Sequence, residues 1–110
     1  MNAKSSRFAG VDLYSLYEAS VQSVDADIDF IEQVWRREHG GRPRTLREDF
    51  CGTASLCARF VLRGAENRAY GVDLDPRPLA WGREHRIALL DEEAASRVEL
   101  HQADVREPVP

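Results

Sequence analysis

Lysine and long apolar runs are the scarcest features of this 110-residue chain. Lys4 is its one lysine, and although arginines bring the basic residues to 15, the 19 acidic residues leave a net charge of −4. General nucleic-acid binding needs a basic surface, so nucleic acid is not an expected partner. No apolar run approaches the roughly 20 residues that span a membrane, and the first residues lack the apolar segment of a signal peptide. We therefore expect a cytoplasmic protein without a membrane segment.

Cysteine is also rare. Cys51 and Cys57 form neither a disulfide framework nor a CxxC metal motif, and we expect two free thiols in a reducing compartment. The histidines show no HExxH or other paired spacing, so no metal site is predicted: they are His39, His85 and His101. What remains is a globular composition, 43% hydrophobic and 31% charged, long enough for one domain with a modest core.

Residues 1–44 are predicted to form a helical lid segment made of two amphipathic helices. The first starts at Asp12 as its N-cap, and the second starts at Asp25 or Asp27. Gly40 and the glycine after it end the second helix. The apolar residues recur at helical spacing: Leu13, Leu16, Tyr17, Val21 and Val24, then Ile28, Ile31, Val34 and Trp35. Tyr14 and Tyr17 are either packing aromatics or part of a lid whose tyrosine hydroxyl reaches a ligand.

Residues 45–110 alternate between strand and helix. Strands are predicted from Thr45, over Asn67 to Leu74, and over Val98 to Ala103. A helix capped by Thr53 and ended by Gly64 joins the first two strands. A second helix from Asp75 and Pro76, with apolar residues as far as Leu90, leads through a polar segment to the third, and the chain closes in a loop. This order predicts an α/β fold: a parallel, Rossmann-like sheet with flanking helices and about three strands, preceded by the two N-terminal helices.

The stretch from Leu46 to Ala54 is the candidate ligand turn. Two acidic residues end the first strand, and Gly52 allows the backbone to approach a ligand closely before the next helix begins. The opening turn of that helix points free N–H groups at whatever lies there. The alternative interpretation is an ordinary connection between a strand and a helix, which often contains a glycine.

Acidic residues end all three predicted strands. Glu48 and Asp49 follow the first, Asp73 the second and Asp104 the third. Ligands of open parallel sheets bind outside the carboxyl ends of the strands, so these carboxylates should share one edge. Asp73 lies 73 − 52 = 21 residues beyond Gly52, a spacing that suits a carboxylate for ribose hydroxyls. Taken singly, each of these acids is also explained as a solvated loop residue, which is the commoner fate of aspartate. That explanation is weaker for all three at these spacings.

Together these motifs resemble the N-terminal half of a class I S-adenosylmethionine-dependent methyltransferase, over roughly residues 45–105. That family has an acid at the end of its first strand and a Gly-x-Gly-x-Gly turn, which Glu48 and Cys51-Gly52-Thr53 match. Gly71-Val72-Asp73 resembles the ribose-binding motif, and Ala103-Asp104 the motif that contacts the adenine amino group. The resemblance implies S-adenosyl-L-methionine as cofactor, with these contacts: Glu48, Asp49, Cys51, Gly52, Thr53, Ala54, Asp73, Leu74, Asp104 and Val105. No catalytic residue is predicted, and the methyl acceptor is not identified.

The chain departs from the family pattern in the turn. Phe50 and Ala54 stand where the first and third glycines are expected, and Asp49 replaces a usually apolar residue. A phenylalanine at this point is expected to change the backbone or the packing beside the cofactor.

Two other functions fit the sequence. One is an NAD(P)-binding fragment of an oxidoreductase, since Asp73 would serve that ribose equally well. Against it, GxGxxG is absent, and Glu48 and Asp49 would repel a pyrophosphate. The other is a non-enzymatic association module. The family's fold continues with further strands, the fourth beside the first, so we expect a truncated chain, or a partner chain or oligomer that completes the sheet. In isolation it is expected to bind cofactor weakly and to be inactive.

Overall fold

The structure is a computed structural model that describes the backbone of residues 13–108 and the side chains of residues 20–108. The elements follow in this order: α2 (Leu13–His39), β1 (Thr45–Asp49), α3 (Ser55–Val61), β2 (Arg68–Asp73), α4 (Pro76–His85), the 3-10 helix η1 (Ile87–Leu89), α5 (Glu92–Ala95) and β3 (Val98–Gln102). The predicted cap Asp12 and the side chains of Tyr14 and Tyr17 lie outside the described residues.

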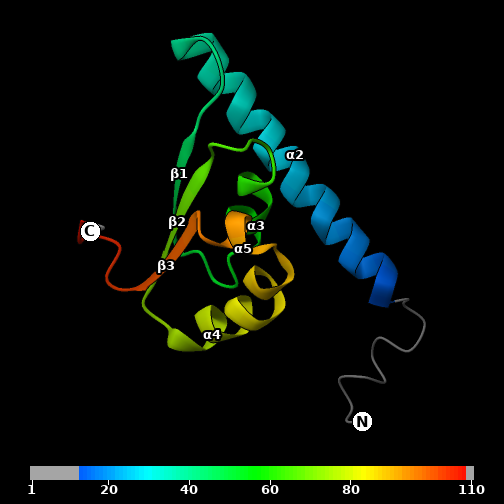
Figure 1. Cartoon of the computed structure of the whole chain (residues 1–110), viewed down its shortest axis with the longest axis vertical. Helices are drawn as coiled ribbons and strands as arrows, with labels where there is room; N and C mark the ends of the chain where they lie inside the picture. Colours follow the sequence, from blue (N-terminus) through cyan, green and yellow to red (C-terminus); the bar gives the residue numbers. More distant parts are fainter. Residues whose placement is uncertain (1–12, 109–110) are drawn as a thin grey trace.

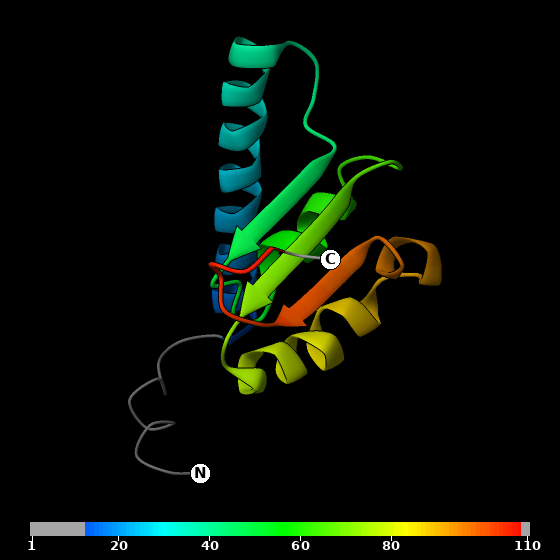
Figure 2. The same cartoon turned by 90° about the vertical axis from the view of Figure 1, so that its left-hand side faces the viewer.

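The three strands form one parallel sheet in the order β1-β2-β3, which confirms the predicted α/β arrangement. In the register of this sheet, Glu48 lies beside Gly71 and Asp73 beside Gln102. The acidic strand ends therefore lie at the same edge. The helices cover one face of the sheet, and the segment after β3 crosses the other face toward β1 (Figures 1 and 2).

The prediction of two N-terminal helices is wrong, because α2 runs unbroken for 27 residues. Asp25, taken as a cap, lies in the middle of this helix and binds α3 instead: its carboxylate accepts hydrogen bonds from Nε and Nη2 of Arg59 at 3.1 and 2.9 Å. An acidic residue inside a helix thus resembled a helix start. The predicted stop is confirmed, since Gly40 has a φ of 74° and its N–H bonds the Arg36 carbonyl.

The core lies between α2, α3 and the covered face of the sheet. Its buried residues include Ile28 of α2, Phe60 of α3 and Ala69 of β2. Arg97 closes the end of this layer, donating from one nitrogen to the carbonyls of Val61, Gly64 and Asn67 at 2.8–3.0 Å. Helix ends leave carbonyls without helical partners, so this guanidinium fixes the connection between α3 and β2.

The connection between β2 and β3 differs from the prediction. A helix starts at Asp75 and Pro76 as predicted, and the Asp75 side chain caps this helix, α4, by accepting from the Arg77 N–H at 3.0 Å. However, α4 ends at His85, and the apolar residues assigned to its end fall in η1 and beyond. The turn allows Leu90 to pack against the core while Leu89 stays 74% exposed. The supposed linker contains α5, capped by the Asp91 carboxylate.

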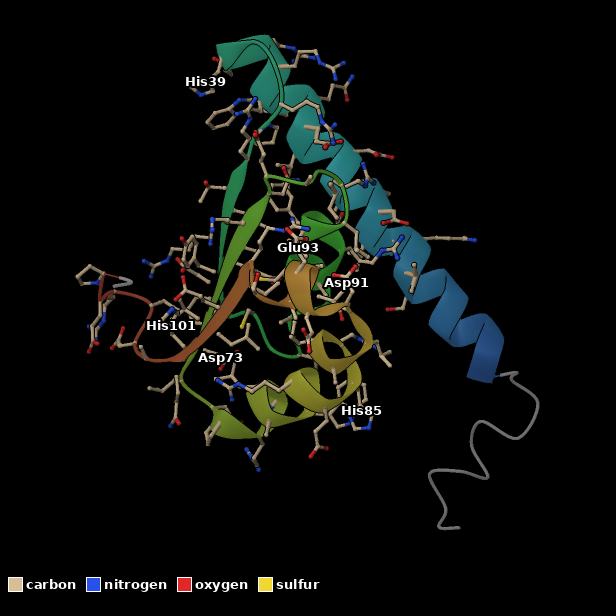
Figure 3. The ribbon with its side chains drawn as sticks, in the orientation of Figure 1. His39, Asp73, His85, Asp91, Glu93 and His101 are labelled. Atoms are coloured by element: carbon tan, nitrogen blue, oxygen red, sulfur yellow. The ribbon has the colours of Figure 1, made fainter. Side chains whose placement is uncertain are left out.

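Within residues 13–108, no helix combines the length and the apolarity that crossing a bilayer requires. Figure 3 shows the three histidines on separate elements: His39 at the end of α2, His85 at the end of α4 and His101 on β3.

Candidate functional site

The turn between β1 and α3 has three left-handed residues at alternating positions. The φ angles are 56° at Phe50, 57° at Gly52 and 61° at Ala54. Two backbone hydrogen bonds hold the turn, from the Cys51 N–H to the Val72 carbonyl and from the Ala54 N–H to the Cys51 carbonyl. Phe50 therefore adopts the conformation that glycine takes at least cost, and its side chain is 75% exposed. The turn keeps its shape without the two missing glycines.

Helix α3 begins one residue later than predicted. Its N-cap is Ala54, with no side-chain cap, so the assignment of Thr53 as the cap is wrong. The hydroxyl of Thr53 lies 3.3 Å from that of Ser55, and its backbone lies against α4. A Cβ added at Gly82 would come within 2.3 Å of the Thr53 carbonyl oxygen. Gly82 thus lets α4 pack directly on the ligand turn.

Glu48 points from β1 toward α3. Its Oε1 accepts a hydrogen bond from the Cys57 thiol at 3.3 Å, and burial raises the pKa of the Glu48 carboxyl. The pKa of Cys57 is also raised, chiefly by burial, and burial raises the pKa of Cys51 to about 11. Both cysteines are free, as predicted. They are also buried, and their raised pKa values keep them protonated at neutral pH. The site consequently contains a half-buried carboxylate whose observed partner is a neutral thiol.

Asp73 joins the turn to the end of β2. One of its carboxylate oxygens accepts from the Gly52 N–H at 2.9 Å, and the other from the Asp75 N–H at 3.0 Å. Figure 3 places Asp73 at the carboxyl end of the sheet, on the side where α4 runs. The predicted spacing between Gly52 and Asp73 thus corresponds to a direct contact.

Asp104 follows at the same edge, because the Ala103 N–H extends the sheet to the Asp73 carbonyl at 3.1 Å. The Arg106 guanidinium binds both oxygens of Asp104 and holds the pKa of that carboxyl below its usual range. The side chain of Asp104 is 30% exposed. Val105 contributes its carbonyl oxygen to a hydrogen bond from Arg47 at 2.6 Å.

Asp49 is separated from the other predicted site residues. Successive side chains of a strand point to opposite faces, and Asp49 binds the Nε of Arg47 at 2.7 Å while Glu48 faces α3. Leu74 lies beyond the end of β2 with 68% of its surface exposed. The structure therefore brings together Glu48, the turn, Asp73 and Asp104, and it places Asp49 on the other face.

Three residues at this site were not predicted: Gly82, Arg47 and Arg106. The signal for Gly82 is a glycine inside an otherwise helical stretch. Arg106 repeats a local pattern, because Asp75 and Arg77 pair in the same way two residues apart. The residues that Arg47 binds lie 58 and 60 positions away in the sequence, and no local sequence pattern predicts these contacts.

Two solved structures of the glycopeptide N-methyltransferase MtfA are similar to this chain. The first has a TM-score of 0.54 at 21% identity, over 70% of this chain and 32% of MtfA. The second, complexed with (S)-adenosyl-L-methionine, has a TM-score of 0.53 at 22% identity, over 66% and 31%. No protein-family model and no curated protein sequence matches the chain. The chain spans about a third of the length of MtfA, and the likeness confirms the predicted Rossmann-like α/β fold.

Proposed function

We propose that this chain is the S-adenosylmethionine-binding part of a methyltransferase. The observation that supports this most is the convergence of three carboxylates, Glu48, Asp73 and Asp104, around one left-handed turn at the carboxyl edge of a parallel sheet. Ligands of such sheets bind at this edge. S-adenosylmethionine carries a sulfonium and an ammonium group, so an acidic edge favours it, whereas a pyrophosphate would be repelled.

The residues fit this cofactor. Burial disfavours the charged form of Glu48. A cation beside this carboxylate would favour the charged form again. Asp73 accepts one backbone N–H on each oxygen, and a carboxylate has about four acceptor sites in all. It retains capacity for both ribose hydroxyls. Asp104 would accept from the adenine amino group, with Leu74 and Val105 as apolar neighbours of the ring.

When bound, the cofactor supplies a methyl group on a sulfonium, which an acceptor displaces directly. The task of this chain is to hold and align that group and to exclude water. A general base is needed only if the acceptor must lose a proton, and we assign no residue of this chain to that role. The methyl acceptor would be bound elsewhere.

Isothermal titration tests the proposal. S-adenosylhomocysteine should bind and NAD should not, because the acidic edge repels the pyrophosphate. Asp73→Ala should weaken the binding of S-adenosylhomocysteine at least about tenfold, because hydrogen bonds to a charged group are lost. Asp27→Ala, an exposed acid on α2, is the matched control and should leave binding unchanged. Equal affinity of the Asp73→Ala protein and the unchanged protein would refute the proposal, as would binding of NAD alone.

A role in association has separate support. Phe30, Val34 and Trp35 leave 66%, 39% and 39% of their surfaces exposed on α2, and together with Ile31 they line a hollow of about 240 Å³. We call these four residues the α2 stripe.

Among the described strands, β1 pairs on one side only, and an open edge offers unpaired backbone groups. We infer that a further polypeptide completes the sheet at β1 and covers the α2 stripe.

Methyl transfer should need that polypeptide. We expect the 110 residues alone to bind the cofactor weakly and to transfer no methyl group. Methyl transfer by the purified chain to any acceptor would contradict this expectation.

A further inference from the structure

The segment that contains Asp104 lies over the face of the sheet that the helices leave uncovered. After β3, residues 103–107 turn back across β2 toward β1 (Figure 2). A hollow of about 360 Å³ lies beneath, lined in part by Val72, His101 and Glu107. Polar contacts from β1 reach across the sheet to this segment.

Arg47 provides those contacts from the opposite edge of the sheet. Its Nη2 donates to the Val105 carbonyl at 2.6 Å and to the Glu107 carbonyl at 3.2 Å. Its Nε donates to Asp49 at 2.7 Å, which leaves the far end of the guanidinium aimed at the segment. A planar guanidinium can make these bonds at once because its donors are arranged in a rigid fork.

The carbonyls that Arg47 holds both belong to the turn that begins at Asp104, because Val105 follows Asp104 directly and Glu107 closes the turn. The Glu107 N–H donates to the Asp104 carbonyl and the Arg106 N–H to the Asp104 carboxylate, each at 2.9 Å. Arg47 thus ties the backbone of this turn to β1, while the Arg106 guanidinium binds both oxygens of the Asp104 carboxylate within the turn. The partner of Arg47, Asp49, acts on the same turn through the guanidinium.

We propose that Arg47 is a positioning residue for adenine recognition: it clamps the turn after β3 so that Asp104 faces the adenine amino group. This inference rests on the proposed function and extends it to a residue that makes no cofactor contact itself. It also gives Asp49 a place in the site without a cofactor contact.

The test compares two ligands that differ at one group: S-adenosylhomocysteine and its purine analogue, in which hydrogen replaces the 6-amino group. The dissociation constant of the purine analogue divided by that of S-adenosylhomocysteine measures recognition of the amino group. We call this quotient the ratio. Arg47→Met removes the clamp and keeps a side chain of similar length. Arg44→Met removes the same charge from an exposed pair with Glu66 and is the matched control. Circular dichroism and thermal unfolding verify that each variant folds.

Arg47→Met should reduce the ratio at least about fivefold, because it weakens the binding of S-adenosylhomocysteine and leaves the binding of the purine analogue nearly unchanged. This is the effect expected from the loss of one charged hydrogen bond. Arg47→Lys should give an intermediate ratio, because an ammonium lacks the rigid fork. Arg44→Met should keep the full ratio. A merely structural role would weaken both ligands equally, and that result, or an unchanged ratio, would overturn the inference.

Amide hydrogen exchange separates this inference from the proposed function. Without any ligand, Arg47→Met should speed exchange at Arg106 and Glu107 at least about threefold relative to the amides of β2, since the turn loses its clamp. Unchanged exchange would overturn the inference. If neither ligand binds the unchanged protein, the proposed function fails, and the exchange result still decides whether Arg47 holds the turn.

Discussion

At the scale of single residues, the ligand turn is built without the glycines that its geometry favours. A non-glycine residue in the left-handed region costs about 1–2 kcal/mol, and Phe50 occupies that region with little packing in return. The Gly52 N–H contact to Asp73 and the bond from Cys51 to Val72 hold the turn in place. The surrounding contacts thus impose a conformation that the local sequence disfavours.

Phe50→Gly should therefore raise the free energy of unfolding by up to about 1 kcal/mol, after subtracting the larger entropy that glycine loses on folding. Denaturant unfolding measures this difference. Phe50→Ala is the control, because it removes the ring but keeps the Cβ and the strain, and it should change little. A Phe50→Gly protein that is less stable than Phe50→Ala would show that the turn is not strained.

Glu48 should give stability and cofactor binding opposite dependences on pH. Its pKa is raised in the folded protein, so the folded state binds more protons and the contribution of Glu48 to stability falls as pH rises above the ordinary value of 4.5. Binding of S-adenosylmethionine should strengthen over the same range, because a cationic ligand favours the carboxylate. Titrations at several pH values against Glu48→Gln test this, and an equal pH dependence in both proteins would disprove it.

Gly82→Ala should destabilise the protein although alanine is the better helix former. Helix propensity alone predicts a gain of about 1 kcal/mol, but the new Cβ would meet the Thr53 backbone at 2.3 Å. Overpacking costs about 1–3 kcal/mol, so a net loss and weaker S-adenosylhomocysteine binding are expected. Ala80→Gly, at an exposed position of α4, reports the propensity effect by itself. A stabilised Gly82→Ala protein would mean that α4 can move away from the turn freely.

At the scale of elements, contacts between α2 and α3 explain why one helix replaces the predicted pair. Asp25 binds Arg59 of α3, and Asp29 and Glu32 bind Arg63, two residues beyond the end of α3. Asp25, one of the two predicted caps of a second helix, therefore belongs to the polar border of the contact between α2 and α3. Ile28, fully buried between them, marks its apolar centre.

Asp25→Asn should lower the free energy of unfolding by about 0.5–1 kcal/mol, the scale of a partly exposed ion pair. The Arg59 guanidinium lowers the pKa of Asp25, so its contribution is present above the ordinary aspartate range and is lost as pH falls. Asp27→Asn, two residues along the same helix and exposed, is the control. Equal unfolding free energies for both variants would contradict this role.

At the scale of the whole molecule, the described residues form a sheet with one covered face and a long helix, α2, beside it (Figure 2). The α2 stripe and the outer edge of β1 are among the surfaces that the described part of the fold leaves uncovered. Unpaired strand edges and exposed apolar side chains are surfaces through which proteins associate.

The purified chain should consequently self-associate through the α2 stripe, and Trp35→Glu should shift it toward a smaller species in sedimentation velocity. Burying a charge in an apolar contact is costly. Leu89→Glu introduces the same charge at a 74% exposed leucine outside the stripe and should leave the sedimentation unchanged. A chain that sediments as a monomer at all concentrations would argue against this surface.

Most of the fold could be predicted from the sequence because its signals are local. The strand starting at Thr45, the glycine stop at Gly40 and the Asp75 cap depend on neighbouring residues. The extent of α2 could not, since Asp25 takes its role from Arg59, which lies 34 residues away. The start of α3 could not either, since Ala54 forms the N-cap without a side-chain cap.

The same division applies to the candidate site. The sequence by itself determined that acids end each strand and that Gly52 and Asp73 lie 21 residues apart, because strand ends and turn glycines follow from local composition. Only the tertiary structure decided that Asp49 faces away with Arg47, that Gly82 supports the turn, and that Phe50 can stand where a glycine is expected. These outcomes depend on which surfaces meet in space, and residues far apart in the chain settle that together.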